Sequence, residues 1–307
     1  MKARIRDFIE TKNGWIFSVA DYTFAEGFRC LLRYVPDSAG NREAGGKKYR
    51  KMEFDESFEF LLREKPEYVH DLHIVPEMDV ARIYRPHEEM SEVAEKDPRV
   101  KRISTILNHG GVPQMCMGIT GSLLVGLQSP SSDIDFVVYG RSWWKAREIV
   151  ARAKANGLIQ ELDESMWRRI YSKRNPEIGF DEFVLHEQRK GNRGMIDGTY
   201  FDLLFTRDWS QIRSTLPGKV IGRDKIVGRV ADAQFSFDSP AIFKLEHEVG
   251  EILCYSHTYA GQALPGEIVE AAGVLEETTA GQRLVVGTTR EARGEWIRSL
   301  TLLDGKS

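Results

Sequence analysis

Residues 115–139 read MCMGITGSLLVGLQSPSSDIDFVVY. An apolar run ends at Gly121-Ser122, and after a polar turn a second run is rich in β-branched and aromatic side chains. This pattern predicts a strand, a tight turn into a short helix, and a second strand. Because side chains alternate between the faces of a strand, we expect Asp133 and Asp135 to project to the same side. Two neighbouring carboxylates repel each other, and a divalent cation that prefers oxygen ligands, Mg²⁺ or Mn²⁺, would relieve that repulsion.

In these residues the chain resembles the nucleotidyltransferase superfamily of polymerase-β type. The motif of that superfamily is an apolar strand, Gly-Ser, about ten residues, and then Asp-x-Asp between apolar residues. Gly121, Ser122, Asp133 and Asp135 match it in order and spacing. The resemblance covers residues 100–207 and is greatest to the archaeal predicted and the minimal nucleotidyltransferases. It implies a metal-dependent enzyme that moves NMP from an NTP to an acceptor hydroxyl and releases pyrophosphate.

The chemistry gives each of these residues a task. Two metal ions can serve the attacking and the leaving oxygens of such a transfer. The first N–H groups of a helix are unpaired and favour phosphate, so we expect Gly121 and Ser122 to bind the triphosphate. Ser122 can cap the helix and also donate its hydroxyl to a β- or γ-phosphate; the simpler alternative is a helix cap alone.

The resemblance also implies a third carboxylate on a later strand. The best match is Asp202, the one charged residue in the run 199–206, TYFDLLFT. A lone carboxylate among these apolar residues would be unfavourable unless it faced a metal. We therefore expect Asp202 to bind one metal and to accept the proton of the attacking hydroxyl. Asp197 and Asp181 are the alternatives, and Asp202 could also be a solvated residue on a half-exposed strand.

Length and composition are typical of an intracellular enzyme. The chain has 307 residues, of which 41% are hydrophobic and 29% charged, enough for two or three domains with apolar cores. No stretch approaches the roughly 20 apolar residues of a membrane span, and the start of the sequence carries charges where a signal peptide would be apolar. We expect a cytoplasmic protein without membrane contact.

Composition along the chain predicts an α+β protein of three domains. Residues 1–97 are expected to form a small N-terminal α/β domain. Residues 98–218 are expected to form the nucleotidyltransferase core, a mixed sheet with helices. Residues 219–307, with short Val- and Ile-rich runs and frequent turns, are expected to form a small β-barrel or sandwich.

The acceptor is the open question. Arg168, Arg169, Arg189 and Lys190 give a local basic bias to a chain with a net charge of −3, which favours RNA, such as a 3′ end, held by these residues and the C-terminal domain. Aromatic residues of that domain, Tyr259 among them, could stack on bases. The basic residues could equally be a solvated face, and the C-terminal domain could only support the core. A protein hydroxyl or, after it, a small molecule as acceptor, and a non-catalytic nucleotide or RNA sensor on the same fold, remain alternatives.

Overall fold

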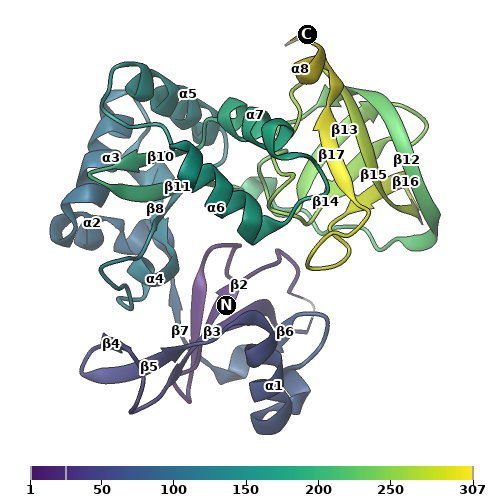
Figure 1. The fold of residues 1–307 in the computed structure, drawn as a ribbon. Coiled ribbons are helices and arrows are strands. Elements are labelled where there is room, and N and C mark those ends of the chain that lie inside the picture. Colours follow the sequence, from purple (N-terminus) through teal and green to yellow (C-terminus); the bar gives the residue numbers. More distant parts are fainter. Residues whose placement is uncertain (1, 25, 306–307) are drawn as a thin grey trace. The chain divides into compact units, whose positions relative to one another are not determined.

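The computed structural model describes residues 2–24 and 26–305, which form an α+β structure with one antiparallel and two mixed sheets (Figure 1). The chain divides into two compact units, each described here by itself. Unit 1 comprises residues 1–160 and 192–214, and unit 2 comprises residues 161–191 and 215–307. The α+β class expected from the sequence is confirmed. The units divide the chain differently from the three expected domains, because residues 161–191 group with the C-terminal sheet.

The first sheet of unit 1, the N-terminal sheet, is antiparallel throughout and runs in the order β4-β5-β3-β2-β1-β7, with β6 paired to β3. Its strands are β1 (Phe8–Thr11), β2 (Ile16–Val19), β3 (Phe28–Pro36), β4 (Arg42–Ala44), β5 (Lys47–Lys51), β6 (His73–Val75) and β7 (Val80–Tyr84). The helix α1 (Phe54–Glu64) follows β5. Leu61 of α1 is buried in the same apolar cluster as Phe17 and Leu32, so the helix covers one face of this sheet.

The second sheet of unit 1, the central sheet, has the order β10-β11-β9-β8. It contains β8 (Met117–Thr120), β9 (Ile134–Tyr139), β10 (Arg193–Ile196) and β11 (Thr199–Thr206). The strands β9 and β11 are parallel and the other pairs are antiparallel. Both central strands are buried on both faces, which explains their nearly continuous apolar sequences.

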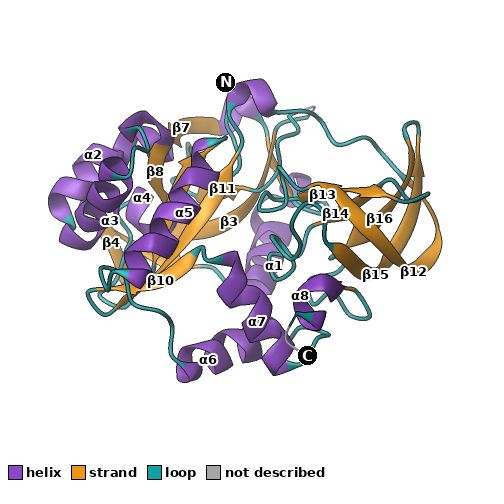
Figure 2. Ribbon diagram, turned by 90° about the horizontal axis from the view of Figure 1, so that it is seen from above, coloured by secondary structure: helices purple, strands orange, loops and turns teal. Residues whose placement is uncertain are grey.

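Four helices of unit 1 accompany the central sheet. They are α2 (Pro86–Lys96), α3 (Pro98–His109), α4 (Gly121–Leu124) and α5 (Ser142–Ala155); α2 packs on β8, and α5 packs on β9 and β11 (Figure 2). The sequence explains the start of α3: Pro98 occupies its first turn, and the Asp97 carboxylate accepts a hydrogen bond from the Arg99 amide at 2.9 Å.

Unit 2 contains a sheet whose pairings close into a ring. Each strand pairs with the next in the order β12 (Lys219–Asp232), β13 (Ala241–Glu246), β14 (Glu251–Cys254), β16 (Gly281–Val286) and β15 (Ile268–Thr278). The ring closes because β15 also pairs with β12, and β17 (Trp296–Ser299) is a further partner of β15. This ring is referred to below as the barrel. Helices α6 (Glu164–Arg174) and α7 (Phe180–Lys190) pack side by side in the same unit, and α8 (Leu300–Asp304) follows β17 (Figure 2).

Candidate functional site

Two of the expected carboxylates lie side by side in the central sheet. Asp135 of β9 and Asp202 of β11 are direct partners across the parallel strand pair. Partners on neighbouring strands project to the same face, and the strands are about 4.8 Å apart. Burial is the largest influence on the carboxyl of Asp135, and together with the charges of Asp202 and Asp133 it raises the pKa of Asp135 to about 6. This is therefore a site at which negative charge is concentrated.

Asp133 lies at the edge of this arrangement. It is exposed and directly precedes β9, and its charge is the weaker of the two carboxylate influences on the pKa of Asp135. Among residues 2–24 and 26–305, no group of three or more His, Cys, Asp or Glu side chains is arranged to hold a metal ion. The structure thus brings Asp135 and Asp202 together, with Asp133 at the exposed end of the strand.

Asp202 is held in place by neighbours that the sequence did not suggest. Arg193 is its direct partner on β10, and the guanidinium Nε lies 2.8 Å from Oδ1 of Asp202. The Tyr200 hydroxyl donates a hydrogen bond to Oδ2 at 2.9 Å. Burial acts to lower the pKa of Arg193, but the adjacent carboxylate of Asp202 outweighs it, and the pKa is raised. Asp202 is therefore a buried, charge-compensated carboxylate rather than a solvated residue.

The Gly121-Ser122 turn lies against the Asp135 carboxylate. Thr120, at the end of β8, pairs directly with Asp135, and Gly121 has a φ of +69°. A Cβ atom at Gly121 would lie 2.4 Å from Oδ2 of Asp135. Glycine is needed here both for its backbone conformation and for the space that the carboxylate occupies. The sequence predicted a glycine in contact with the site, although for the approach of a phosphate rather than of a carboxylate.

The helix cap differs from the prediction. Thr120 occupies the N-cap position of α4, and Ser122 is a half-buried residue inside the first turn, so the expectation that Ser122 caps the helix is wrong. The Thr120 hydroxyl donates to the Arg6 carbonyl at 2.6 Å instead of capping. This bond ties the turn to the N-terminal sheet.

The alternatives for the third carboxylate lie elsewhere. Asp197 is in the turn between β10 and β11, where it forms an ion pair with Arg102. Asp181 is an exposed residue in the first turn of α7, in unit 2. Of the three candidate carboxylates, Asp202 is the one that is a strand partner of Asp135.

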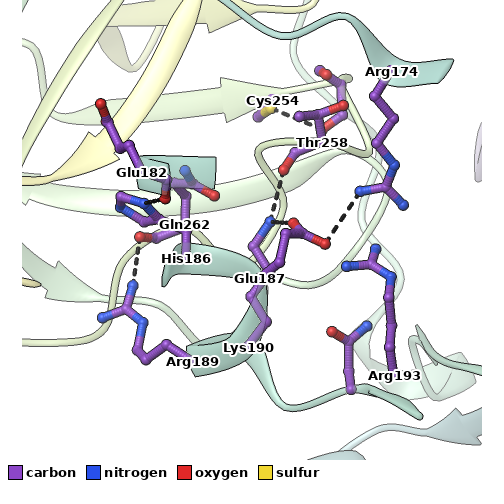
Figure 3. A network of polar contacts seen from close by, with 12 residues as sticks. Arg174, Glu182, His186, Glu187, Arg189, Lys190, Arg193, Cys254, Thr258 and Gln262 are labelled. Carbon is purple, nitrogen blue, oxygen red and sulfur yellow. Dashed lines mark hydrogen bonds and ion pairs between the residues drawn. The ribbon is translucent and has the colours of Figure 1, made fainter. Parts of the chain in front are cut away.

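The predicted basic surface is wrong for two of its four residues. Lys190 is 1% exposed, and its ammonium donates to the Glu187 carboxylate at 2.5 Å and to the Thr258 carbonyl at 2.7 Å (Figure 3). Arg189 forms an ion pair with Glu267 and donates to the Gln262 carbonyl at 2.6 Å. These charges join α7 to the barrel within unit 2 and are not presented to solvent.

The other two basic residues remain at the surface. Arg168 and Arg169 are exposed on α6, and Arg168 lies over the Phe180 ring at 4.3 Å and pairs with Glu164 at 2.5 Å. In the loop between β14 and β15, Tyr259 is 1% exposed and its hydroxyl accepts a hydrogen bond from the Glu177 amide at 3.0 Å, so Tyr259 packs in the interior and cannot stack on a base.

The comparisons with known proteins place the chain in a family. It is 39% identical over 337 residues to an uncharacterized protein of Methanocaldococcus jannaschii, MJ1086, and the match covers 97% of this chain and 99% of that protein. The chain therefore belongs to the same family as the methanogen protein. No family model and no solved structure matches the sequence. Within the described residues, every helix is too short or too polar to cross a membrane.

Proposed function

We propose that unit 1 is a metal-dependent nucleotidyltransferase with a core of polymerase-β type, formed by β8, α4, β9 and β11. The observation that carries this proposal is the direct pairing of Asp135 with Asp202, with Gly121 pressed against the Asp135 carboxylate. The motif residues, which the sequence places far apart, are neighbours in the central sheet. Burial first, and then the charges of Asp202 and Asp133, raise the pKa of Asp135, and a bound cation would relieve the repulsion between these carboxylates.

The donor set fits Mg²⁺ or Mn²⁺, since it consists of carboxylate oxygens. Asp135 and Asp202 would hold the metal, and Asp133 would join them from the start of β9. The metal would supply charge stabilisation for the attacking and leaving oxygens.

The residues of the chain have distinct tasks in the proposed reaction. The acceptor hydroxyl attacks the α-phosphorus of the NTP, its proton passes to Asp202, and the bond between the α-phosphorus and the bridging oxygen breaks so that pyrophosphate leaves. Arg193 and Tyr200 position Asp202, because they fix both of its oxygens. The Gly121-Ser122 turn would orient the triphosphate beside this pair.

RNA and a protein hydroxyl are the two leading acceptor classes, ahead of a small molecule. RNA is supported by the exposed Arg168 and Arg169, but the inward-facing Lys190 weakens that support. A protein hydroxyl is the second candidate, favoured by the net charge of −3, which opposes general attraction to nucleic acid.

The test is transfer of label from each α-labelled NTP, with Mg²⁺, to total cellular RNA or to a protein extract. We expect the natural chain to label one macromolecular fraction, and digestion with ribonuclease or protease identifies its class. The Asp133→Asn/Asp135→Asn double variant should label neither fraction. Equal labelling by the natural chain and the double variant would exclude these carboxylates from the reaction.

A further inference from the structure

Some half-buried arginines of unit 1 have no carboxylate partner among the described residues. Several other arginines of this unit do form ion pairs, as Arg29 does with Asp21 and Arg82 with Glu89. Within the described residues, Arg6, Arg33 and Arg42 form no ion pair with a carboxylate. All three are half-buried, so their charges are partly removed from water.

These arginines lie around the turn that follows β8. The Arg6 carbonyl accepts the Thr120 hydroxyl at the start of α4, and Nη1 of Arg42 donates to the Leu127 carbonyl just after α4, at 3.5 Å. Between these points, Leu124 and Val125 pack in one apolar cluster with Tyr34 of β3. Residues of the N-terminal sheet thus pack against the end of α4, with the Arg6 backbone at the start of this helix and the Arg42 guanidinium just past its end.

Arg33 occupies an irregular position on β3. Ile16 pairs with Tyr34 and the next residue, Phe17, pairs with Leu32, so Arg33 is the extra residue of a β-bulge. Bulges redirect side chains and are frequent next to active sites. Because of the bulge, Tyr34 joins the cluster over α4 while Leu32 packs in the opposite cluster with α1.

The backbone of Arg6 lies near Asp135, because the Arg6 carbonyl accepts the hydroxyl of Thr120, which is the strand partner of Asp135. The charges of Arg6 and Arg33 act to lower the pKa of Asp135, although burial outweighs them. Burial raises the pKa of Tyr34, while Arg33 and Arg42 oppose that rise and Asp135 adds to it. Arg33 therefore acts on both Asp135 and Tyr34, and Arg42 acts on Tyr34.

Two further features indicate that this cluster is built for a ligand. Arg6 has a φ of +80°, a strained conformation for a residue with a side chain. The Nε atoms of Arg6 and Arg42 are buried and have no acceptor among the described residues. Buried donors without acceptors are unfavourable, and phosphate oxygens match the guanidinium donors in charge and geometry.

We propose that Arg6, Arg33 and Arg42 form a binding site for clustered phosphates beside Asp135. This deepens the proposed function, and rests on it, where the phosphates are those of the NTP donor. The same chemistry would also hold phosphates of the acceptor. The N-terminal sheet then contributes to the site, and the triphosphate is bound between its arginines and the Gly121-Ser122 turn.

The test is calorimetric binding of inorganic triphosphate to the full chain. Arg33→Gln and Arg42→Gln should each weaken binding about tenfold or more, the loss of a charged hydrogen bond. Arg63→Gln, which removes an exposed charge from α1 in the same unit, is the matched control and should bind like the natural chain. Unchanged thermal unfolding midpoints would exclude loss of folding as the cause.

The outcomes separate this inference from the proposed function. Equal affinity in the Arg33, Arg42 and Arg63 variants, or no triphosphate binding by the natural chain, would overturn the inference. Arginine-dependent binding without nucleotidyl transfer would leave the inference standing and refute the function. In a competition arm, displacement by saturating NTP assigns the site to the donor, and persistence of triphosphate binding assigns it to phosphates of the acceptor.

Discussion

Removing the charge of Asp135 should stabilise the protein when no metal is bound. The pKa of Asp135 rises from 3.8 to about 6 on folding. The folded state therefore binds the proton more tightly than the unfolded state. The raised pKa therefore contributes to the stability of the folded state at low pH, and this contribution is lost as the pH rises from 3.8 to about 6. A pKa difference of about two units corresponds to a free-energy cost of about 3 kcal/mol for the charged carboxylate in the folded state at pH 8. Because Asp135 retains some exposure, we expect a gain of about 1–3 kcal/mol for Asp135→Asn.

The assay is denaturant unfolding of the natural chain and Asp135→Asn in a chelating buffer at pH 4 and pH 8. Asp135→Asn should have a higher free energy of unfolding than the natural chain at pH 8. The difference should be small at pH 4, where the Asp135 carboxyl of the natural chain is also protonated in the folded state. Asp224→Asn, at an exposed position on β12, is the control and should show little change at either pH.

Adding Mg²⁺ should reverse the order of stability. A ligand that binds only the folded state stabilises it by about 2.7 kcal/mol at one hundred times its dissociation constant. We expect this increase for the natural chain and not for Asp135→Asn. An Asp135→Asn variant that is less stable than the natural chain at pH 8 without metal would refute the reasoning, as would equal stabilisation of both by Mg²⁺.

Three further predictions concern single residues. Lys190→Met should destabilise the protein by about 3–5 kcal/mol, because it leaves the buried Glu187 carboxylate without its closest partner. The control Arg169→Met, on the exposed face of α6, should change the free energy of unfolding little. Similar losses of stability in both variants would contradict the buried ion pair. Burial lowers the pKa of His186 to about 4, so the free energy of unfolding should fall by up to about 3 kcal/mol as the pH drops from 6.5 towards 4. His186→Gln should remove this part of the pH dependence. The same dependence of stability on pH in His186→Gln and the natural chain would contradict this role of His186. Gly121→Ala should abolish nucleotidyl transfer and raise the unfolding rate measurably. The new methyl group would meet the Asp135 carboxylate, and the positive φ at this position is unfavourable for alanine. A fully active variant would disprove the close contact.

The local part of the site could be predicted from the sequence. The strand expected at residues 199–206 is β11 with the same bounds, because a nearly continuous β-branched, leucine and aromatic run has few other conformations available. The turn at Gly121 was predictable for a similar reason, since only glycine accepts its backbone conformation easily. The pairing of Asp135 with Asp202 was expected only by resemblance, because the register between distant strands depends on tertiary packing.

The errors have physical causes as well. Lys190 was predicted at the surface because a lysine in a basic segment is usually solvated, yet Glu187 three residues earlier could have indicated an ion pair on one face of α7. The helix α7 was missed because its buried face includes His186, Glu187 and Lys190, which hide the apolar periodicity. The importance of Arg33 could not be predicted, since a β-bulge is created by pairing between strands.

The most direct test of the central claim is to determine which bond of the NTP is broken. Parallel reactions with α-labelled and γ-labelled NTP, in the presence of Mg²⁺ and cellular extract, should transfer only the α label to the acceptor and release the γ label as pyrophosphate. The Asp135→Asn variant should neither transfer the α label nor release the γ label as pyrophosphate. Transfer of the γ label, release of the γ label as monophosphate, or transfer that persists in Asp135→Asn would contradict a nucleotidyltransferase built on Asp135 and Asp202.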